Sequence, residues 1–306
     1  MILTYNVTEK HDKKTLLMLL RKEMRLSAGM VRRLKAVQGI FVNGKPVYTN
    51  FTVSTGDVVT ADIGAAEPEC DIVPEDGDVS VLFENEGLLA VNKPAGLIVH
   101  PTHSRYTGTL SNFVAGYLLK TTGSAVCHAV NRLDRDTSGV VLFSKNSHYK
   151  DLAGQALADD SASKEYLALV HGFFDEPRGT IDAPIKRLEE MKLLRVIAQD
   201  GQQAVTHYEV LKSGTVCGCD VTLLRLRLET GRTHQIRVHT LSIGHPILGD
   251  KMYCTKDSAA CSEKLFLDTQ SLHAETLSFI DPVSNKAVSV AAPITREGMK
   301  KIISKL

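Results

Sequence analysis

The densest cluster of polar side chains in the sequence covers residues 131–139, Asn-Arg-Leu-Asp-Arg-Asp-Thr-Ser-Gly, directly before an apolar run. Its first carboxylate, Asp134, lies between the arginines Arg132 and Arg135. Nearby positive charge favours the ionised form of a carboxyl group and can hold it in one orientation. A fixed carboxylate of this kind could act on a substrate, although a solvated surface turn with weak salt bridges has the same composition.

A second polar cluster, Glu-Thr-Gly-Arg-Thr-His-Gln-Ile-Arg-Val-His, covers residues 229–239. Arg237 stands between two apolar residues that we expect to be buried. A buried guanidinium needs a carboxylate partner, which it can bind through two hydrogen bonds. His234 and His239 are five positions apart, so they do not share a helix face as the histidines of a His-Glu-x-x-His zinc motif do. The pattern therefore indicates an anchored arginine and no metal site.

Two further segments matter only in combination with these clusters. Tyr166 opens the strand-like run 164–170, where a tyrosine most often packs against a core. Residues 92–101 contain proline and glycine, which indicate a turn and no chemistry by themselves. Cys217 and Cys219 form an isolated pair, and zinc would need two more ligands at suitable spacing. We therefore expect no metal from the cysteines either.

The elements that must position these residues follow from the apolar patterns after residue 78. The continuous apolar run 139–145 predicts a buried strand directly behind Asp134. Helical spacing occurs in two segments, 109–120 and 149–158. Helices interspersed irregularly among hairpin-like strands predict an α+β fold with a mixed, mainly antiparallel sheet. Further strands are expected within 79–93, 164–174, 207–214, 219–231 and 272–282.

Residues 1–64 predict a separate compact unit of two small helices and a hairpin. An apolar stripe indicates a first helix within 15–26, and Ser27 takes the N-cap position of a second. Asn43-Gly44 is a strong hairpin-turn signal, with 46–53 as the returning strand. The second helix is expected to direct three basic side chains outward: Arg32, Arg33 and Lys35.

Charge is distributed unevenly along the chain. Residues 1–50 hold ten basic and three acidic side chains, a balance of +7. The formal net charge of all 306 residues is +1, so the remainder carries 1 − 7 = −6. A basic unit on a mildly acidic body indicates a polyanion partner, although a solvated lysine-rich face would look similar. Residues 65–79 hold six acids and no base, which predicts a linker that polyanions avoid, ahead of a domain over 80–306.

The sequence also bounds where the protein works. No apolar stretch approaches the roughly 18 residues needed to cross a membrane. The first residues lack the charged start and apolar run of a secretory signal. We therefore expect a cytoplasmic protein with no membrane partner, whose six cysteines are reduced thiols.

Four segments resemble, in order, the RluA-type family of pseudouridine synthases: NKPAGLIVHP from position 92, RLDRDTSG from 132, KEYLALVHG from 164, and TGRTHQIRVH from 230, followed by GHPILGDKMY. The resemblance spans roughly residues 80–297. Residues 1–64 resemble an S4 RNA-binding domain, through the two basic helices and the hairpin GIFVNGKPV. Together they imply a monomeric isomerase that modifies RNA without a cofactor. Ribosomal RNA is the favoured partner, with transfer RNA as the alternative.

The resemblance also implies roles for single residues. Asp134 takes the place of the nucleophilic aspartate, Tyr166 of the tyrosine that packs on the base, and Arg237 of the arginine paired with that aspartate. Arg132 matches the arginine that helps to open the RNA. Asn131 departs from the family, which usually has histidine there. RNA contacts are expected from Asn131, Arg132, Arg135, Thr137, Arg232, His234, Gln235, Lys93, Arg32, Arg33 and Lys35.

The implied reaction begins with flipping of a stacked and paired uridine out of the RNA. Asp134 then either attacks C1′ or removes a ribose proton to give a glycal, and the sequence leaves both open. Two other functions also remain open. One is a non-catalytic RNA-binding protein of the same fold. The other is a glycoside hydrolase that uses Asp134 and Asp136, whose carboxyl groups would need to lie about 5–5.5 Å apart in a retaining mechanism.

Overall fold

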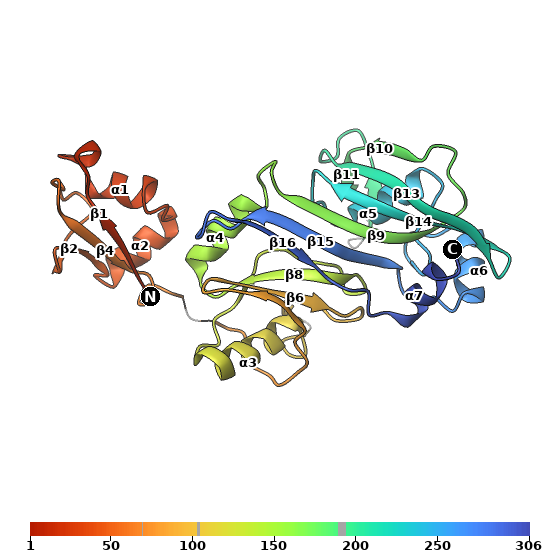
Figure 1. Ribbon diagram of the computed structural model, residues 1–306, viewed down its shortest axis with the longest axis horizontal. Coiled ribbons are helices and arrows are strands. Elements are labelled where there is room, and N and C mark those ends of the chain that lie inside the picture. Colours follow the sequence, from red (N-terminus) through yellow and green to blue (C-terminus); the bar gives the residue numbers. More distant parts are fainter. Residues whose placement is uncertain (69, 103–104, 189–193) are drawn as a thin grey trace.

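The computed structural model describes residues 1–68, 70–102, 105–188 and 194–306. They form a small N-terminal unit at one end of the long axis and a larger unit built on one extended sheet (Figure 1). None of the helices described is both long and apolar enough to span a lipid bilayer.

The N-terminal unit contains a four-stranded sheet in the order β1-β4-β2-β3. Two helices, α1 (Leu16–Lys22) and α2 (Ala28–Ala36), accompany it, after a single 3-10 turn η1 (Glu9–His11). Apolar side chains from the helices and the sheet share one core, which makes the unit compact in its own right. Its strands are β1 (Ile2–Asn6), β2 (Ile40–Val42), β3 (Lys45–Pro46) and β4 (Val58–Asp62).

Two local signals in this unit are confirmed. Ser27 Oγ accepts the backbone N–H of Met30 at 3.2 Å and so caps α2. Asn43 and Gly44 both have positive φ, 51° and 76°. Positive φ at both central residues defines the mirror-image turn that two-residue hairpins favour.

Three other features of the unit differ from the prediction. The returning strand is only β3, and residues 47–53 do not continue it. Instead, the carbonyls of Thr49 and Phe51 accept N–H groups from the first turn of α1. The first helix ends at Lys22, because the chain reverses through Arg25 in a left-handed conformation (φ 53°). Strand β1 was not predicted, since its side chains alternate only between exposed and half-buried.

The larger unit is built on ten strands along the path β10-β13-β14-β9-β15-β8-β6-β5, with β16 beside β15 and β7 beside β8. Among the described residues only β8 and β15 pair in parallel, so the predicted mixed, mainly antiparallel sheet is confirmed. The ten strands are β5 (Val81–Glu84), β6 (Leu88–Lys93), β7 (His128–Ala129), β8 (Ser138–Ser144), β9 (Ser163–His171), β10 (Arg178–Asp182), β13 (Val205–Val216), β14 (Cys219–Leu228), β15 (Leu272–Ile280) and β16 (Ala287–Ala291). A separate pair consists of β11 (Ile185–Arg187) and β12 (Arg195–Ile197).

Helices cover this sheet in the described part of the chain, and α3 and α4 confirm the two helices predicted for it. The first of these is capped by Thr109 and ends at Gly123, which has a left-handed conformation (φ 76°). Alternate residues of β6 and β8 enter different cores, one with α4 and one with α3, which explains their continuous apolar runs. The helices are α3 (Leu110–Thr122), α4 (Ser147–Ala156), α5 (Gln235–Ser242), α6 (Lys256–Lys264) and α7 (Glu297–Ile303).

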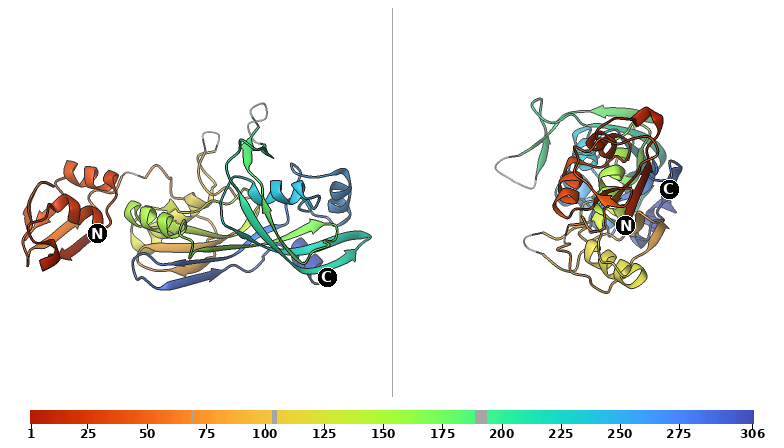
Figure 2. Two further views of the ribbon diagram at one scale, coloured as in Figure 1. Left: turned by 90° about the horizontal axis from the view of Figure 1, so that it is seen from above. Right: turned by 90° about the vertical axis from the view of Figure 1, so that its left-hand side faces the viewer.

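Residues 65–79, predicted to be a linker, pack against the larger unit where the structure describes them. Glu67 accepts the backbone N–H of Ser147 at 3.0 Å and pairs with His128 at 2.8 Å. Ile72 is buried in the core beside α3. Glu67 and Ile72 therefore help to fix the path between the two units (Figure 2), because both are held by the larger unit.

Gly139 sets the approach of the polar loop to the centre of the sheet. At this residue β8 runs beside β15, opposite Ala274. Its φ is 116°, and a Cβ there would lie 2.0 Å from the carbonyl oxygen of Ala274. Only glycine fits such a close approach, so the loop before β8 is held against β15.

Candidate active site

A cleft of about 1020 Å³ opens beside the polar loop that precedes β8. The loop, the C-terminal end of α4, the start of β9 and the segment between β14 and α5 form its walls. This volume suits a small molecule or a single flipped nucleotide. The polar and aromatic side chains that line it include Arg132, Asp134, Lys164, Tyr166, Arg232 and His234.

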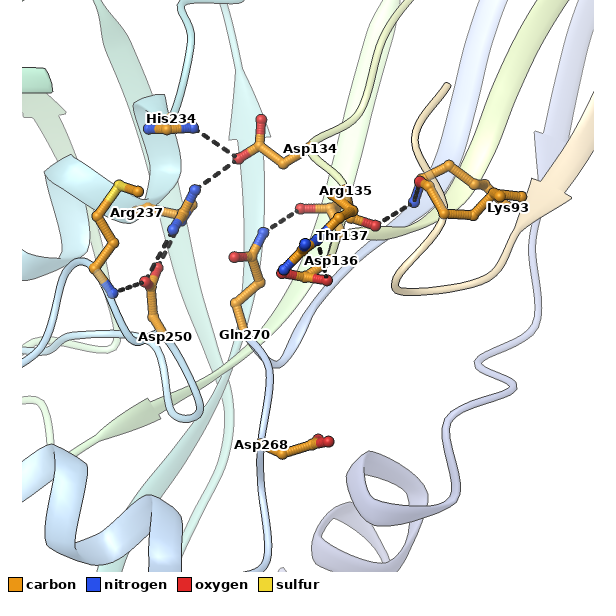
Figure 3. A network of polar contacts seen from close by, with 12 residues as sticks. Lys93, Asp134, Arg135, Asp136, Thr137, His234, Arg237, Asp250, Asp268 and Gln270 are labelled. Atoms are coloured by element: carbon orange, nitrogen blue, oxygen red, sulfur yellow. Dashed lines mark hydrogen bonds and ion pairs between the residues drawn. The ribbon is translucent and has the colours of Figure 1, made fainter. Parts of the chain in front are cut away.

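Asp134 lies in this loop with 28% of its side chain exposed. Its Oδ2 accepts a hydrogen bond from Arg237 Nη1 at 3.0 Å. His234 Nε2 lies 3.7 Å from the same oxygen (Figure 3). The N–H of Thr137 donates to the Asp134 carbonyl at 3.2 Å and closes the loop. The carboxylate is therefore oriented from the start of α5 and still borders the cleft.

Arg237 joins two carboxylates instead of forming the two-bond pair that was expected with Asp134. Its side chain is 8% exposed. Nε and Nη2 donate to the two oxygens of Asp250, at 2.6 and 2.9 Å, and only Nη1 reaches Asp134. Burial opposes the charge of Arg237, but the hydrogen bond and charge of Asp250 outweigh it and raise the arginine pKa. The guanidinium is thereby a permanent positive charge directly behind Asp134, which lines the cleft.

Asp250 was missed by the sequence analysis. Its side chain is 0% exposed and also accepts the backbone N–H groups of Met252 and Tyr253, at 2.9 and 3.0 Å. A guanidinium carries five N–H donors, which one partly exposed carboxylate cannot satisfy. That donor count could have indicated a second acceptor for Arg237, although not its position.

His234 reaches Asp134 through a left-handed backbone (φ 58°) at the start of α5. Its Nδ1 lies 3.0 Å from the hydroxyl of Tyr253, which accepts the N–H of Arg195 at 2.8 Å. That hydroxyl is therefore able to donate to Nδ1 and leave the Nε2 proton directed at Asp134. Burial lowers the pKa of His234, against the opposing charge of Asp134, so the imidazole is mainly neutral at pH 7.

Tyr166 lies on β9 opposite Leu226 of β14 and Ala274 of β15, and its side chain lines the cleft. Burial raises the pKa of Tyr166 to about 12, and the negative charge of Asp134 adds to the shift. The phenol is therefore neutral over the whole physiological range. It presents an aromatic ring beside the carboxylate.

Lys93, predicted to contact RNA, is instead an internal brace with 0% exposure. Its Nζ donates to the carbonyls of Pro94, Leu97 and Arg135, at 2.9, 2.8 and 2.8 Å. Burial lowers the pKa of Lys93 to about 8, against the opposing charges of nearby carboxylates. The lysine ties its own turn to the loop that carries Asp134, so the predicted contact was wrong.

Two more residues predicted to contact RNA, Thr137 and Gln235, hold the loops from inside, and a third, half-buried Asn131, lines the cleft while it also bonds the protein. Thr137 is buried, and its hydroxyl accepts from Gln270 Nε2 at 2.8 Å. Gln235 is buried, and its Oε1 accepts the N–H of Arg232 at 2.9 Å. The amide of Asn131 bonds backbone groups of β8 at 2.7 and 3.3 Å. Polar residue type suggested exposure, but these side chains satisfy backbone and side-chain groups of the protein.

The remaining basic residues divide by location. Arg132 and Arg232 are exposed on the cleft walls, whereas exposed Arg135 pairs with Asp136 at 3.2 Å and does not line the cleft. Figure 3 shows Asp136 beside Arg135, while Asp134 turns toward α5. The pair of carboxylates required for a glycoside hydrolase is therefore not assembled at these two positions.

On α2, Arg32 and Lys35 point outward as predicted, but Arg33 does not. Arg33 Nε donates to the carbonyl of Ala66, and Nη2 donates to Ser147 Oγ, both at 2.9 Å. Ser147 is the first residue of α4, so Arg33 joins the N-terminal unit to the larger one. Arg33 is half-buried and does not face outward as expected, because its guanidinium is used in this contact; its contact with RNA stays a prediction.

Within the described ranges, no group of three or more His, Cys, Asp or Glu side chains is arranged to hold a metal ion. The site is instead a carboxylate in contact with a buried arginine, beside an aromatic ring, in a cleft of nucleotide size. The relatives of the chain identify the class of protein to which such a site, on a mixed sheet of this kind, belongs.

The family model for RNA pseudouridylate synthase matches residues 87–242. The "uncharacterized RNA pseudouridine synthase YhcT" of Bacillus subtilis is 34% identical over 287 residues, which are 94% of this chain and 92% of the relative. "Ribosomal large subunit pseudouridine synthase D" of Zymomonas mobilis is 38% identical over 256 residues, 81% of this chain and 78% of the relative. The solved structure of human RNA pseudouridylate synthase domain containing 1 aligns with a TM-score of 0.59 at 26% identity, over 74% of this chain and 86% of that one. The chain belongs to the RNA pseudouridine synthase family and is an isomerase, which confirms the RluA-type resemblance.

Proposed function

We propose that this isomerase converts specific uridines of structured, large-subunit ribosomal RNA to pseudouridine, with Asp134 as nucleophile. The observation that carries the residue assignment is the 3.0 Å contact of Asp134 with Arg237 at the wall of the cleft. The Zymomonas relative, named as a ribosomal large subunit enzyme, supports the choice of RNA. Transfer RNA is the second candidate.

The proposal extends to how the chain is divided. Residues 1–64 act as an S4-type RNA-binding domain, and residues 80–306 form the catalytic domain. Support comes from the separate cores of the two units. We further propose a monomer that works in the cytoplasm without a cofactor, since exchange of one glycosidic bond for another involves no net oxidation.

The reaction starts with access to the uridine. The C1′ and C5 atoms of a stacked, paired uridine cannot be reached in place, so the nucleotide is flipped into the cleft at a cost of a few kcal/mol. Exposed Arg132, on the cleft wall beside Asp134, is positioned to fill the space that the uridine leaves. Its length and permanent charge suit it to hold the opened RNA.

Asp134 then acts at the ribose. Either its carboxylate attacks C1′ or it removes a ribose proton to give a glycal, and in both routes the N1–C1′ bond breaks. The uracil rotates within the cleft and C5 forms the new bond to C1′. This displaces the Asp134 carboxylate from C1′ in the first route, and in the second Asp134 returns the ribose proton. The C5 proton then leaves while N1 gains one. Arg237 orients Asp134 for this role, because its guanidinium is itself held by Asp250 and donates to one oxygen of Asp134 at 3.0 Å.

Tyr166 is proposed to stack on the flipped uracil, and replacement variants test this. Tyr166→Phe keeps the ring, so the KM for RNA should stay within about twofold, whereas Tyr166→Leu loses the stacking. Base–aromatic stacking is worth about 1–3 kcal/mol, so the leucine variant should raise KM about 5- to 150-fold. Steady-state kinetics of both variants check the prediction. Equal KM values for Phe and Leu would show that the ring does not stack.

Arg32 and Lys35 on α2 are proposed to bind phosphates. The variant Arg32→Ala with Lys35→Ala should reduce the slope of log K against log salt by about 1.8 for duplex contacts, or about 1.4 for single-stranded ones. Filter binding to a ribosomal RNA transcript at several salt concentrations measures the slope. Arg33→Ala serves as the control. It removes a contact between the two units but leaves both proposed phosphate-binding side chains in place, so the salt slope should not change. An unchanged slope in the double variant would remove α2 from the RNA contact.

The function itself is tested by mapping pseudouridine in cellular RNA with and without this gene, and by incubating the protein with RNA that carries tritium at uridine C5. We expect defined ribosomal sites to disappear in the deletion strain and tritium to be released in vitro. Loss of sites only from transfer RNA would correct the target. Absence of both effects would leave a non-catalytic RNA-binding protein.

A further inference from the structure

We propose that a groove between α6 and α7 is a second RNA-binding surface, which holds single-stranded RNA outside the catalytic cleft. The inference rests on RNA being the substrate. The groove has a volume of about 640 Å³, and the ends of α6, α7 and the β13–β14 turn line it. These elements lie at the opposite end of the molecule from the N-terminal unit (Figures 1 and 2). We call it the Phe266 groove, after its exposed aromatic side chain.

Phe266 occupies a position that is unfavourable for phenylalanine in two ways. It follows α6 in a left-handed conformation (φ 55°), where glycine or asparagine is preferred. The next N–H, from Leu267, donates to the Ser262 carbonyl at 2.9 Å, as in a normal helix C-terminal motif. The Phe266 side chain is 91% exposed, so its ring gains almost nothing from packing. Neither backbone preference nor packing explains a phenylalanine at this position, so we assign the ring to contact with a partner.

Charge identifies the chemistry of that partner. Four lysines line the groove, and the one described acidic side chain there, Glu297, pairs with Lys300 at 2.9 Å. The lining therefore has a surplus of three positive charges on a chain whose formal net charge is only +1. A local surplus of this kind attracts a polyanion. The other three lysines are Lys264, Lys301 and Lys305.

An aromatic ring among lysines is the pattern that binds single-stranded nucleic acid. The ring stacks on a base of any sequence, while the lysines follow the phosphates. An acidic peptide would use the lysines, but it would contact Phe266 only if it also carried an aromatic or apolar side chain at the right place. Every nucleotide of RNA carries both a phosphate and a base, so RNA explains both features of the groove without that further condition.

The groove is connected to the loop that carries the proposed nucleophile. Gln270, four residues after Phe266, donates to the hydroxyl of Thr137 at 2.8 Å. Arg296, directly before α7, donates to the Gln270 carbonyl at 3.0 Å. The segments that line the groove are thus hydrogen-bonded, through Gln270, to the loop that borders the cleft. Because the groove does not touch the reacting atoms, its loss should raise KM and leave kcat unchanged.

The first test is Phe266→Gly, with binding of a fluorescent 12-residue oligouridylate measured by anisotropy. We expect Kd to rise about tenfold, within the range of one lost base stack. The melting temperature should be equal to or above that of the wild type, since glycine prefers this backbone conformation. A lower melting temperature with unchanged Kd would show that the ring is structural and would overturn the proposal.

The second test removes three lysines together, in the variant Lys264→Ala, Lys301→Ala and Lys305→Ala. Its salt slope for the same oligouridylate should fall by about 2, at about 0.7 per single-strand contact. Lys286→Ala, an exposed lysine in the β15–β16 turn, is the control and should leave the slope unchanged. An equal loss per lysine in the control would mean diffuse attraction. Polyglutamate that displaces the oligouridylate at equal charge would indicate an acidic protein partner, and either result overturns the proposal.

Tritium release from RNA labelled at uridine C5 tests the enzyme assignment separately from the groove proposal. If the wild type releases tritium and the groove variants match its KM, the groove proposal fails and the enzyme assignment stands. If the wild type releases none, the enzyme assignment fails, and the binding measurements still decide the groove.

Discussion

Asp134→Asn is expected to abolish pseudouridine formation and to leave the protein folded. The amide keeps the size of the carboxylate and one acceptor for Arg237, but it is neither a nucleophile nor a base at neutral pH. Arg237 also retains its two bonds to Asp250. Removal of an essential nucleophile lowers kcat by as much as about 10⁶-fold in enzymes where it has been measured. Tritium release from labelled RNA measures the loss, and thermal unfolding checks the fold.

Asp136→Asn is the matched control for this experiment. It removes the second carboxylate of the same loop, which pairs with exposed Arg135 and does not line the cleft. We expect activity within a fewfold of the wild type, since exposed ion pairs contribute little. Substantial turnover by the Asp134 variant, or complete loss in the Asp136 variant, would assign the chemistry to a different group.

Arg237→Ala is expected to lower both stability and activity. The substitution leaves Asp250, at 0% exposure, without its two-bond partner, and Asp134 without the charge that faces it. Loss of one member of a buried ion pair costs about 3–5 kcal/mol. Urea denaturation should show that decrease in the free energy of unfolding, and tritium release should fall with it. A variant with wild-type stability and activity would contradict the role of Arg237 at both levels.

A double variant separates the two roles of the arginine. Arg237→Met with Asp250→Asn removes both buried charges, while asparagine can still accept the N–H groups of Met252 and Tyr253. Neutral replacement of a buried pair is often tolerated, so stability should recover by several kcal/mol relative to Arg237→Ala. Activity should remain low, because Asp134 still lacks its cation. Recovery of activity together with stability would mean that the arginine only supports the fold.

The parts of the fold that the sequence predicted are those determined by neighbouring residues. The run 139–145 is apolar throughout because β8 is buried on both faces, so it was recognised as a strand. Ser27 caps a backbone N–H three residues away, and Asn43-Gly44 adopts the turn conformation at its own two positions. The start of α2 and the turn between β2 and β3 were therefore predictable from local sequence. The family resemblance then placed Asp134, Tyr166 and Arg237 together, and all three lie at the cleft or contact a residue that does.

The wrong predictions concern partners that lie far away in the chain. Lys93 was expected on the surface, but its three acceptors include a carbonyl 42 residues later. Thr137 was expected to contact RNA, but it is buried by a bond to Gln270, 133 residues away. A polar side chain looks solvent-exposed in a sequence unless its internal partner is known. Asp250 and the packed acidic segment 65–79 were missed for the same reason.

The central position of β15 has a consequence for the order of assembly during synthesis. This strand lies between β8 and β9, so the middle of the sheet stays incomplete until residues after 272 leave the ribosome. The N-terminal unit closes with β4, which ends at residue 62, and its contacts are local enough to form early. A nascent chain would thus present a folded basic unit long before the loop of Asp134 gains its support from β15. On the proposed role of residues 1–64 in RNA binding, such an order would let the growing protein bind RNA at a stage when it is still unable to modify it.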